Sequence, residues 1–202
     1  MAKKSNDTPV VLSKIYTRTG DAGSTNLGDM STAPKTDLRI AAYADVEEAN
    51  AAIGTALALG EVPDAMRELL ARVQNELFDL GADLSTPLAP DPEYPPLRVE
   101  QDYIDRLEAA CDAYNADLPV LRSFILPGGT PTVALMHQAR VVARRAERSA
   151  WAAIAEHGTG DGGGMNVLAV KYLNRLSDLL FVLGRVLGAD GGEVLWKPGG
   201  ER

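Results

Sequence analysis

The sequence predicts an all-α fold in which five helices form one bundle, within a single domain that spans residues 1–202. Three observations lead to this prediction. Long stretches place apolar residues at intervals of three and four, which is the period of an amphipathic helix. One cluster of prolines interrupts these stretches. With 202 residues, of which 46% are hydrophobic, the chain can enclose one sizeable core, and neither an internal repeat nor a second domain is evident.

Each helix is predicted from its composition and from the residues that end it. The first is rich in alanine, the strongest helix former, and Gly60 ends it. Five prolines between residues 87 and 96 are incompatible with a helix and predict a stiff surface connection. The glycine-rich stretch 158–164 predicts a loop before the last helix. The five helices are expected at residues 38–60, 62–84, 100–115, 132–157 and 165–187.

The chain ends and the overall composition narrow the class of protein. Residues 1–13 are expected to be a flexible tail without the character of a signal peptide, and residues 188–202 an irregular tail. No apolar stretch reaches the roughly 18 residues of a membrane helix. The net charge of −8 disfavours nucleic acid and anionic membranes, so a polyanion would need a local basic pocket. One cysteine, Cys111, and two histidines offer neither a disulfide nor a zinc cluster, which is typical of a cytoplasmic protein.

Polar side chains form a stripe along three of the predicted helices, beside the apolar face. At about 100° per residue, the members of each stripe fall on one side of their helix. The stripes contain Tyr43, Glu47, Asn50 and Gly54 in the first helix; His137, Arg140, Arg144, Glu147 and Trp151 in the fourth; and Lys171, Asn174, Asp178 and Arg185 in the last. One interpretation is a solvent-exposed face with ion pairs between adjacent turns. Repetition on three helices instead favours a subunit interface or a ligand pocket, and the pattern does not choose between these two.

The stretch TRTGDAGST, residues 17–25, contains no large apolar side chain and is rich in hydroxyl and charged groups. Gly20, Asp21 and Gly23 alone could build a turn between two strands. The alternative is a phosphate-binding loop, because backbone N–H groups and hydroxyls can surround a phosphate, and Lys35 adds a positive charge. Arginines four residues apart on a helix suit the same ligand, since guanidinium groups bind phosphate oxygens in pairs. The sequence contains neither a Walker A motif nor a dinucleotide-binding glycine motif.

Six blocks of sequence, taken together and in order, resemble the ATP:cob(I)alamin adenosyltransferases of the propanediol-utilisation (PduO) type. They are TRTGDAGST, Lys35, AYADVEEANAAIG, FILPGG, HQARVVARRAER and YLNRLSDLLF. The resemblance extends from about residue 14 to residue 187. It implies a homotrimer of five-helix bundles with a ferritin-like up-and-down arrangement, in which ATP binds between neighbouring subunits. The implied reaction transfers the 5′-deoxyadenosyl group of ATP to the cobalt of reduced cobalamin, cob(I)alamin, releases triphosphate and yields adenosylcobalamin.

The resemblance also implies roles for individual residues at matching positions. Phe124 corresponds to the aromatic side chain that lies under the corrin ring. Arg140 corresponds to an arginine that pairs across the subunit interface with an acidic residue of the first helix; here this residue is Glu47, where the family usually has aspartate. Arg144 and Glu147 are implied in catalysis together with Phe124. Nucleotide contacts are implied for Thr17, Arg18, Thr19, Gly20, Asp21, Gly23, Ser24, Thr25, Lys35, Arg140, Arg144, Glu147, Arg148 and Asn174.

Mg²⁺ is implied as the companion of ATP, held through the phosphates, with Glu147 as the one protein group expected near the ion. Further implied partners are a reductase that supplies the electron to cobalt and a mutase that uses adenosylcobalamin. The chemistry requires positioning and charge stabilisation as triphosphate leaves, and no proton transfer. Two other functions stay open. One is an ATP-dependent carrier that delivers adenosylcobalamin to a mutase, and the other is a structural helical oligomer whose polar stripes form interface ion pairs.

Overall fold

The computed structural model describes residues 15–191 and 193–199. Its helices are α1 (Leu38–Leu59), α2 (Asp64–Ser85), α3 (Gln101–Asn115), α4 (Pro131–His157) and α5 (Val167–Leu187), followed by the 3₁₀ helix η1 (Ala189–Gly191). Two short strands, β1 (Ser24–Asn26) and β2 (Thr32–Pro34), form an antiparallel hairpin before α1. The prediction of an all-α, five-helix fold is confirmed. The tail predicted at residues 1–13 lies outside the described part of the chain.

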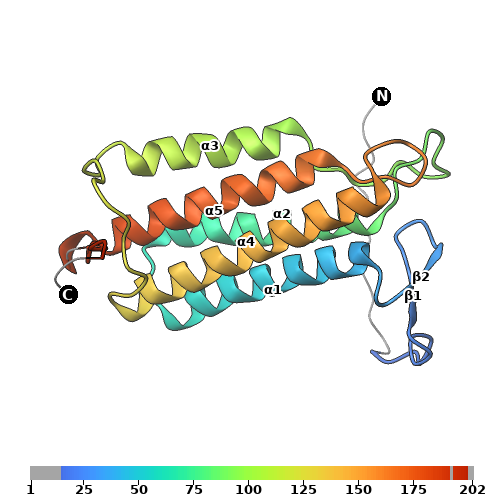
Figure 1. Ribbon diagram of the computed structural model, residues 1–202, viewed down its shortest axis with the longest axis horizontal. Helices are drawn as coiled ribbons and strands as arrows, with labels where there is room; N and C mark the ends of the chain where they lie inside the picture. The colour runs from blue at the N-terminus through green and yellow to red at the C-terminus, as the bar shows by residue number, and fades with distance from the viewer. Residues whose placement is uncertain (1–14, 192, 200–202) are drawn as a thin grey trace.

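The helices alternate in direction along the bundle (Figure 1). α1 packs against α2 and α4, α4 packs against α5, and α3 lies on the outer side of α5. The hairpin and the loops that follow α2 and α4 gather at one end of the bundle, whereas the loop after α3 and the residues after α5 gather at the other (Figure 1). α4 has 27 residues and therefore separates the two ends by about 40 Å.

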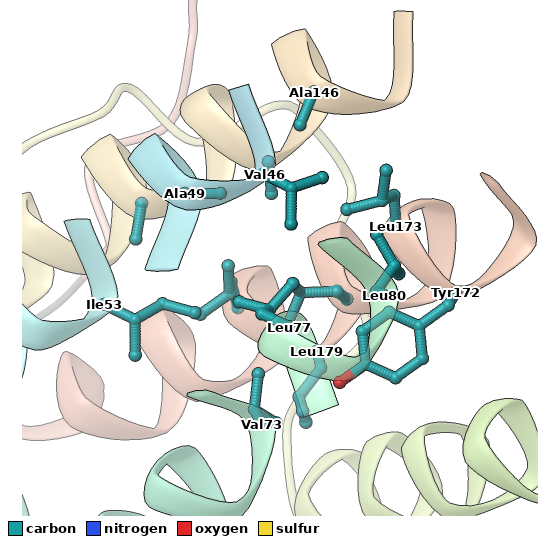
Figure 2. Close-up of a cluster of buried hydrophobic side chains, with 14 of the residues drawn as sticks. Val46, Ala49, Ile53, Val73, Leu77, Leu80, Ala146, Tyr172, Leu173 and Leu179 are labelled. Carbon is teal, nitrogen blue, oxygen red and sulfur yellow. The ribbon is translucent and has the colours of Figure 1, made fainter. Parts of the chain in front are cut away.

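The core is built from small side chains between α1 and α4 and from leucines between α2 and α5. Ala42, Ala49 and Ala56 of α1, like Ala139, Ala143, Ala146 and Ala150 of α4, have no exposed surface. Alanine lets two helices approach closely, which explains why these sequences are rich in it. Figure 2 shows the next layer, where Val46 and Ile53 of α1 lie near Leu77 and Leu80 of α2 and Leu173 of α5.

Polar side-chain caps fix the starts of three of the five helices near the predicted positions. Asp37 accepts a hydrogen bond of 2.7 Å from the backbone N–H of Arg39 at the start of α1. Thr130 and Asn166 make the equivalent side-chain caps of α4 and α5. The second and the last helix were each predicted to begin two residues early, because Pro63 and Asn166 are the non-helical N-cap residues of helices that begin at Asp64 and Val167.

Candidate functional site

Residues 17–23 form a compact loop that precedes β1, and residues 24 and 25 belong to that strand. The turn that joins β1 to β2 spans residues 27–31. The interpretation of Gly20, Asp21 and Gly23 as the turn between two strands is therefore wrong. Because this loop does not connect the two strands, its polar groups are available to bind a ligand.

Backbone turns give this loop its shape. The N–H of Asp21 donates to the carbonyl of Arg18 at 3.3 Å, and that of Gly23 to the carbonyl of Gly20 at 3.2 Å. Arg18 and Gly23 adopt positive φ angles of 64° and 83°. Lys35 closes the loop, because its N–H donates to the Gly23 carbonyl at 2.8 Å. Its side chain lies over Gly20, where an added Cβ would come within 2.9 Å of Lys35 Nζ, so a glycine allows this approach.

Hydroxyl groups complete the loop surface. Thr17 and Thr19 are exposed and share a hydrogen bond of 2.8 Å between their Oγ1 atoms. Ser24 and Thr25 are half-buried in β1. The structure thus brings together the loop residues and Lys35 as one polar, positively charged surface at the hairpin end of the bundle.

The exposed face of α4 carries arginine charge that the chain does not neutralise. Arg144 and Arg148 are exposed and form no ion pair with any described residue, whereas Arg145 between them pairs with Glu48 and Asp45 of α1. Arg140 stacks over the ring of Phe181, with 5.3 Å between the guanidinium carbon and the ring centroid. Burial, and then the charge of Arg144, lower the pKa of Arg140. Such a cluster favours an anionic ligand.

Glu147 and Asn174 meet beside these arginines. Asn174 donates from Nδ2 to Glu147 Oε1 at 3.1 Å, while its own Oδ1 accepts from Arg175 at 2.8 Å. Arg175 in turn pairs with Glu108 of α3 at 2.6 Å. The group borders a cavity of about 390 Å³ that Trp151 and Lys171 also line, although Trp151 is half exposed.

Among the described residues beside Glu147 and Asn174, the group available to bind a metal ion is one carboxylate. The part of the chain that the structure describes holds no group of three histidine, cysteine or acidic side chains placed to bind an ion. Of the pair above, Asn174 Oδ1 is already engaged by Arg175, which leaves Glu147 Oε2 as the open ligand atom. These residues fit a hard cation that arrives with most of its oxygen ligands already supplied by phosphates.

Phe124 lies at the opposite end of the bundle from the loop. Its side chain is 77% exposed and makes an edge contact with Trp196, with ring centroids 6.1 Å apart. The two aromatic residues border a cavity of about 900 Å³, which Phe181, Arg140 and His137 also line. The cavity is therefore walled by aromatic faces and has arginine charge at its edge, which suits a large, flat, largely apolar ligand.

The residues after α5 contribute to this cavity, which sequence reasoning did not anticipate for a segment described only as an irregular tail. The backbone N–H of Trp196 donates to the Phe124 carbonyl at 2.7 Å, and that of Leu126 to the Val194 carbonyl at 2.8 Å. Arg185 anchors the segment through an ion pair of 2.6 Å with Glu193. The one available indication was the apolar run VLW after a pair of glycines.

Three residues predicted on the polar stripes are buried instead. Asn50 is 8% exposed, because it faces α2 and donates to the Gln74 carbonyl at 2.9 Å. Arg185 is only 6% exposed, because the segment after α5 covers the last turn of that helix. His137 is only 7% exposed, and the segments around Ile125 and Val194 lie beside it. Arg185 and His137 both lie on the side of their helix that the 100° spacing predicts. The prediction of exposure failed because other segments of the chain cover this side near the helix ends.

One chain does not bring all the predicted residues together. Asp37, next to the loop, bonds His157 at the last residue of α4, whereas Phe124 precedes the first. Along α4, Arg144 is therefore about 20 Å from either end. Glu47 is exposed on α1 and pairs with no described residue, so the predicted pair with Arg140 does not form within the chain.

Comparisons with known proteins agree on one family. The family model described as cobalamin adenosyltransferase matches residues 15–187. A corrinoid adenosyltransferase of Mycobacterium tuberculosis strain H37Rv is 62% identical over 193 residues, which cover 96% of this chain and 97% of the relative. One from Bacillus subtilis is 39% identical over 183 residues, which cover 89% of each chain.

Solved structures show the same fold. A variant of the PduO-type ATP:corrinoid adenosyltransferase from Lactobacillus reuteri, in complex with cobalamin and ATP, aligns with a TM-score of 0.81 and 32% identity. The alignment covers 91% of this chain and 99% of that one.

Among the described helices, none combines the length and apolar character needed for a membrane span.

Proposed function

This chain belongs to the cobalamin adenosyltransferase family, and we propose that it transfers the 5′-deoxyadenosyl group of ATP to the cobalt of cob(I)alamin. The products are adenosylcobalamin and triphosphate. The observation that carries the proposal is the exposed face of α4, where arginines without ion-pair partners lie between a hydroxyl-rich loop and an aromatic cavity. A polyanion and a large flat ring are the two substrates that such a surface fits.

The triphosphate is assigned to the arginines and the loop. Arg144 and Arg148 offer guanidinium groups for phosphate oxygens, and the loop offers Lys35 and exposed hydroxyls. Glu147 and Asn174, already in contact, complete the nucleotide site. As the bond between C5′ and the bridging oxygen breaks, negative charge develops on the departing triphosphate. Fixed positive groups stabilise this charge more in the transition state than in bound ATP.

The nucleotide site is assigned to the boundary between two copies of the chain in a homotrimer. About 20 Å of α4 separates the end that carries the loop from Arg144, which is too far for one loop to cover the arginines of its own chain. A neighbouring copy can bring its loop to this face. Glu47 and Arg140, both without an ion-pair partner within the described chain, would then pair across the same boundary.

The corrin ring is assigned to the aromatic cavity, with Phe124 against the face of the ring away from the nucleotide. A phenyl ring has no lone pair to donate, so it excludes an axial ligand from cobalt(II). Four-coordinate cobalt(II) accepts an electron more readily, and a cellular reductase would supply it. The resulting cobalt(I) uses its electron pair to form the bond to C5′, while the electrons of the broken C5′–O bond leave with triphosphate.

Mg²⁺ is assigned to the triphosphate, with Glu147 as the protein group beside it. Bound there, the ion would neutralise phosphate charge. The protein side chains themselves bind, orient and stabilise charge, and no proton needs to move.

An anaerobic visible-spectrum assay tests the proposal. Chemically reduced cob(I)alamin and MgATP are mixed with the purified protein, and the loss of the cobalt(I) band is followed together with triphosphate release. Adenosylcobalamin and triphosphate formed in equal amounts would support adenosyl transfer. ATP and corrinoid bound without product would instead indicate a carrier that delivers adenosylcobalamin to a mutase, and no ATP binding would leave a structural oligomer.

A further inference from the structure

The chain contains two histidines, and the structure treats them differently. His157 at the end of α4 bonds Asp37 Oδ1 through Nε2 at 2.9 Å. His137 near the start of the same helix is 93% buried, since its exposed fraction is 7%, yet neither ring nitrogen has a hydrogen-bond partner among residues 15–191 and 193–199. Because no described residue bonds the ring, its nitrogens must take their hydrogen bonds from water or from a ligand in an adjoining space, so His137 requires an explanation.

The unpartnered nitrogens of His137 face open space. Within the described residues, the one side-chain polar atom both sealed from solvent and unpartnered is Asn50 Oδ1, so the His137 nitrogens are not sealed. His137 lines the aromatic cavity of about 900 Å³ with Phe124 and Phe181. It also lines a hollow of about 60 Å³ on the side of Gly184. The imidazole therefore forms part of the wall between these two spaces.

The surroundings of His137 keep the ring neutral. Burial, and then the positive charge of Arg140 one turn along α4, lower its pKa below the ordinary value of 6.5. The other charged groups that line the adjoining spaces are Arg122 and Lys197 on the cavity side and the paired Arg185 and Glu193 on the side of the small hollow. A neutral imidazole presents one N–H donor and one nitrogen acceptor. No other described group on this wall offers both functions on one ring.

Resting on the proposed function, we propose that His137 hydrogen-bonds a primary carboxamide on the rim of the corrin ring and thereby determines affinity for the corrinoid. The corrin macrocycle is largely apolar, but its rim carries acetamide and propionamide side chains, each with an N–H donor and a carbonyl acceptor. The aromatic side chains of the cavity match the face of the ring. His137 matches the rim, because its two nitrogens complement a carboxamide.

Two substitutions at this position separate hydrogen bonding from packing. Gln retains a donor and an acceptor on a side chain of similar reach, whereas Leu fills space without either. The measurement is the binding of cob(II)alamin and of cob(II)inamide in the presence of MgATP, by visible and electron paramagnetic resonance spectroscopy. Cobinamide keeps the carboxamides of the rim but lacks the nucleotide tail. His157→Gln is the matched control.

The expected result is a specific loss of corrinoid affinity. His137→Leu should bind both corrinoids about tenfold more weakly, the effect of one hydrogen bond lost with its partner left unpaired. His137→Gln should stay within about twofold of the wild type, and so should His157→Gln. Affinity for ATP should be unchanged in all three variants, since the contact is made only with the corrinoid.

Four outcomes would overturn the proposal. If His137→Leu bound corrinoids as tightly as the wild type, the proposed hydrogen bond would not exist. If the variant lost ATP affinity to the same extent as corrinoid affinity, the role of His137 would be structural. A loss seen with cob(II)alamin but not with cob(II)inamide would place the contact on the nucleotide tail. Nitrogen hyperfine structure on cobalt(II) that disappears in His137→Leu would make the imidazole an axial ligand. If the wild type makes adenosylcobalamin while any of these holds, this inference alone fails; if the wild type binds no corrinoid, the proposed function fails with it.

Discussion

The two ends of the bundle differ in how completely they satisfy their polar groups. At the hairpin end, Asp83 is 1% exposed and accepts hydrogen bonds from Arg98 at 2.6 Å, from the Val99 N–H at 2.8 Å and from Asn166 at 2.6 Å. Arg39, at 2% exposure, donates to the carbonyl of Leu84 in the last turn of α2 at 3.0 Å and to that of Gly163 in the loop after α4 at 2.6 Å. The chain alone satisfies these two buried side chains.

At the opposite end, the chain leaves groups without partners. Phe124 is 77% exposed, Arg140 has no carboxylate partner within the described residues, and His137 is buried without a hydrogen bond. The ion pair of Arg185 with Glu193 holds the wall of the cavity but does not reach these side chains. Paired groups therefore indicate where the fold is stabilised, and unpaired groups where a ligand is expected.

The largest effect is expected from removing the carboxylate of Asp83 at the well-paired hairpin end. Asp83→Ala should lower the free energy of unfolding by about 3 kcal/mol, because it removes a buried carboxylate that pairs with the Arg98 guanidinium and accepts from the Val99 N–H and the Asn166 amide. Asp105→Ala, an exposed carboxylate on α3, should change it by less than about 0.5 kcal/mol. Chemical denaturation measures both. Equal stabilities for the two variants would mean that the polar cluster contributes nothing to the fold.

The adjacent Arg144 and Arg145 of α4 show the same difference between unpaired and paired groups within one turn of helix. Arg144→Ala should reduce kcat by about 100-fold or more, since a charge available to the departing triphosphate is lost while alanine preserves the helix. Arg145→Ala is the matched control, because Arg145 is already paired with Glu48. Its turnover should remain within about twofold. Steady-state kinetics with circular dichroism distinguishes the cases, and a normal kcat in Arg144→Ala would refute its role.

The exposed ring of Phe124 should matter for cobalt chemistry more than for nucleotide binding. Phe124→Ala should slow turnover that starts from cob(II)alamin by at least about tenfold, because an axial ligand can then reach cobalt and impede its reduction. Affinity for ATP should be unaffected. Tyr94→Ala is a suitable control, since Tyr94 is 75% exposed but lies in the proline-rich loop. Loss of ATP affinity in parallel with turnover would argue against the position of Phe124 under the ring.

Local sequence was sufficient to predict the helices. The periodicity of apolar residues and the capping side chains act within a few residues, so the bounds of α3, α4 and α5 were predicted to within two residues. The resemblance, and not the periodicity, had placed Glu147 and Asn174 in one site, and they meet because their helices are adjacent. Lys35 meets the loop because a short hairpin returns the chain to it.

The wall of the aromatic cavity could not be predicted in the same way. Trp196 meets Phe124 through backbone hydrogen bonds between segments far apart in sequence, and these depend on no side-chain pattern. A helical wheel gives the angle of His137 but not the segments that cover the first turns of α4. The unpartnered state of that imidazole is equally invisible in the sequence, because it depends on what every neighbouring element leaves unoccupied.

The smallest expected effect is a loss of stability at mildly acidic pH that depends on His137. Because burial and Arg140 lower the pKa of the folded imidazole below 6.5, the unfolded chain takes up its proton first as the pH falls. The free energy of unfolding should therefore decrease from about pH 6.5 downward, until the folded protein is protonated as well. His137→Leu removes this contribution, so it should lose less stability between about pH 7 and about pH 5 than the wild type. Gln138→Leu, which adds the same side chain at the exposed neighbouring position, should retain the wild-type loss. Urea unfolding across this range measures the difference, and parallel curves for His137→Leu and the wild type would show that the imidazole titrates as freely in the folded protein as in the unfolded chain.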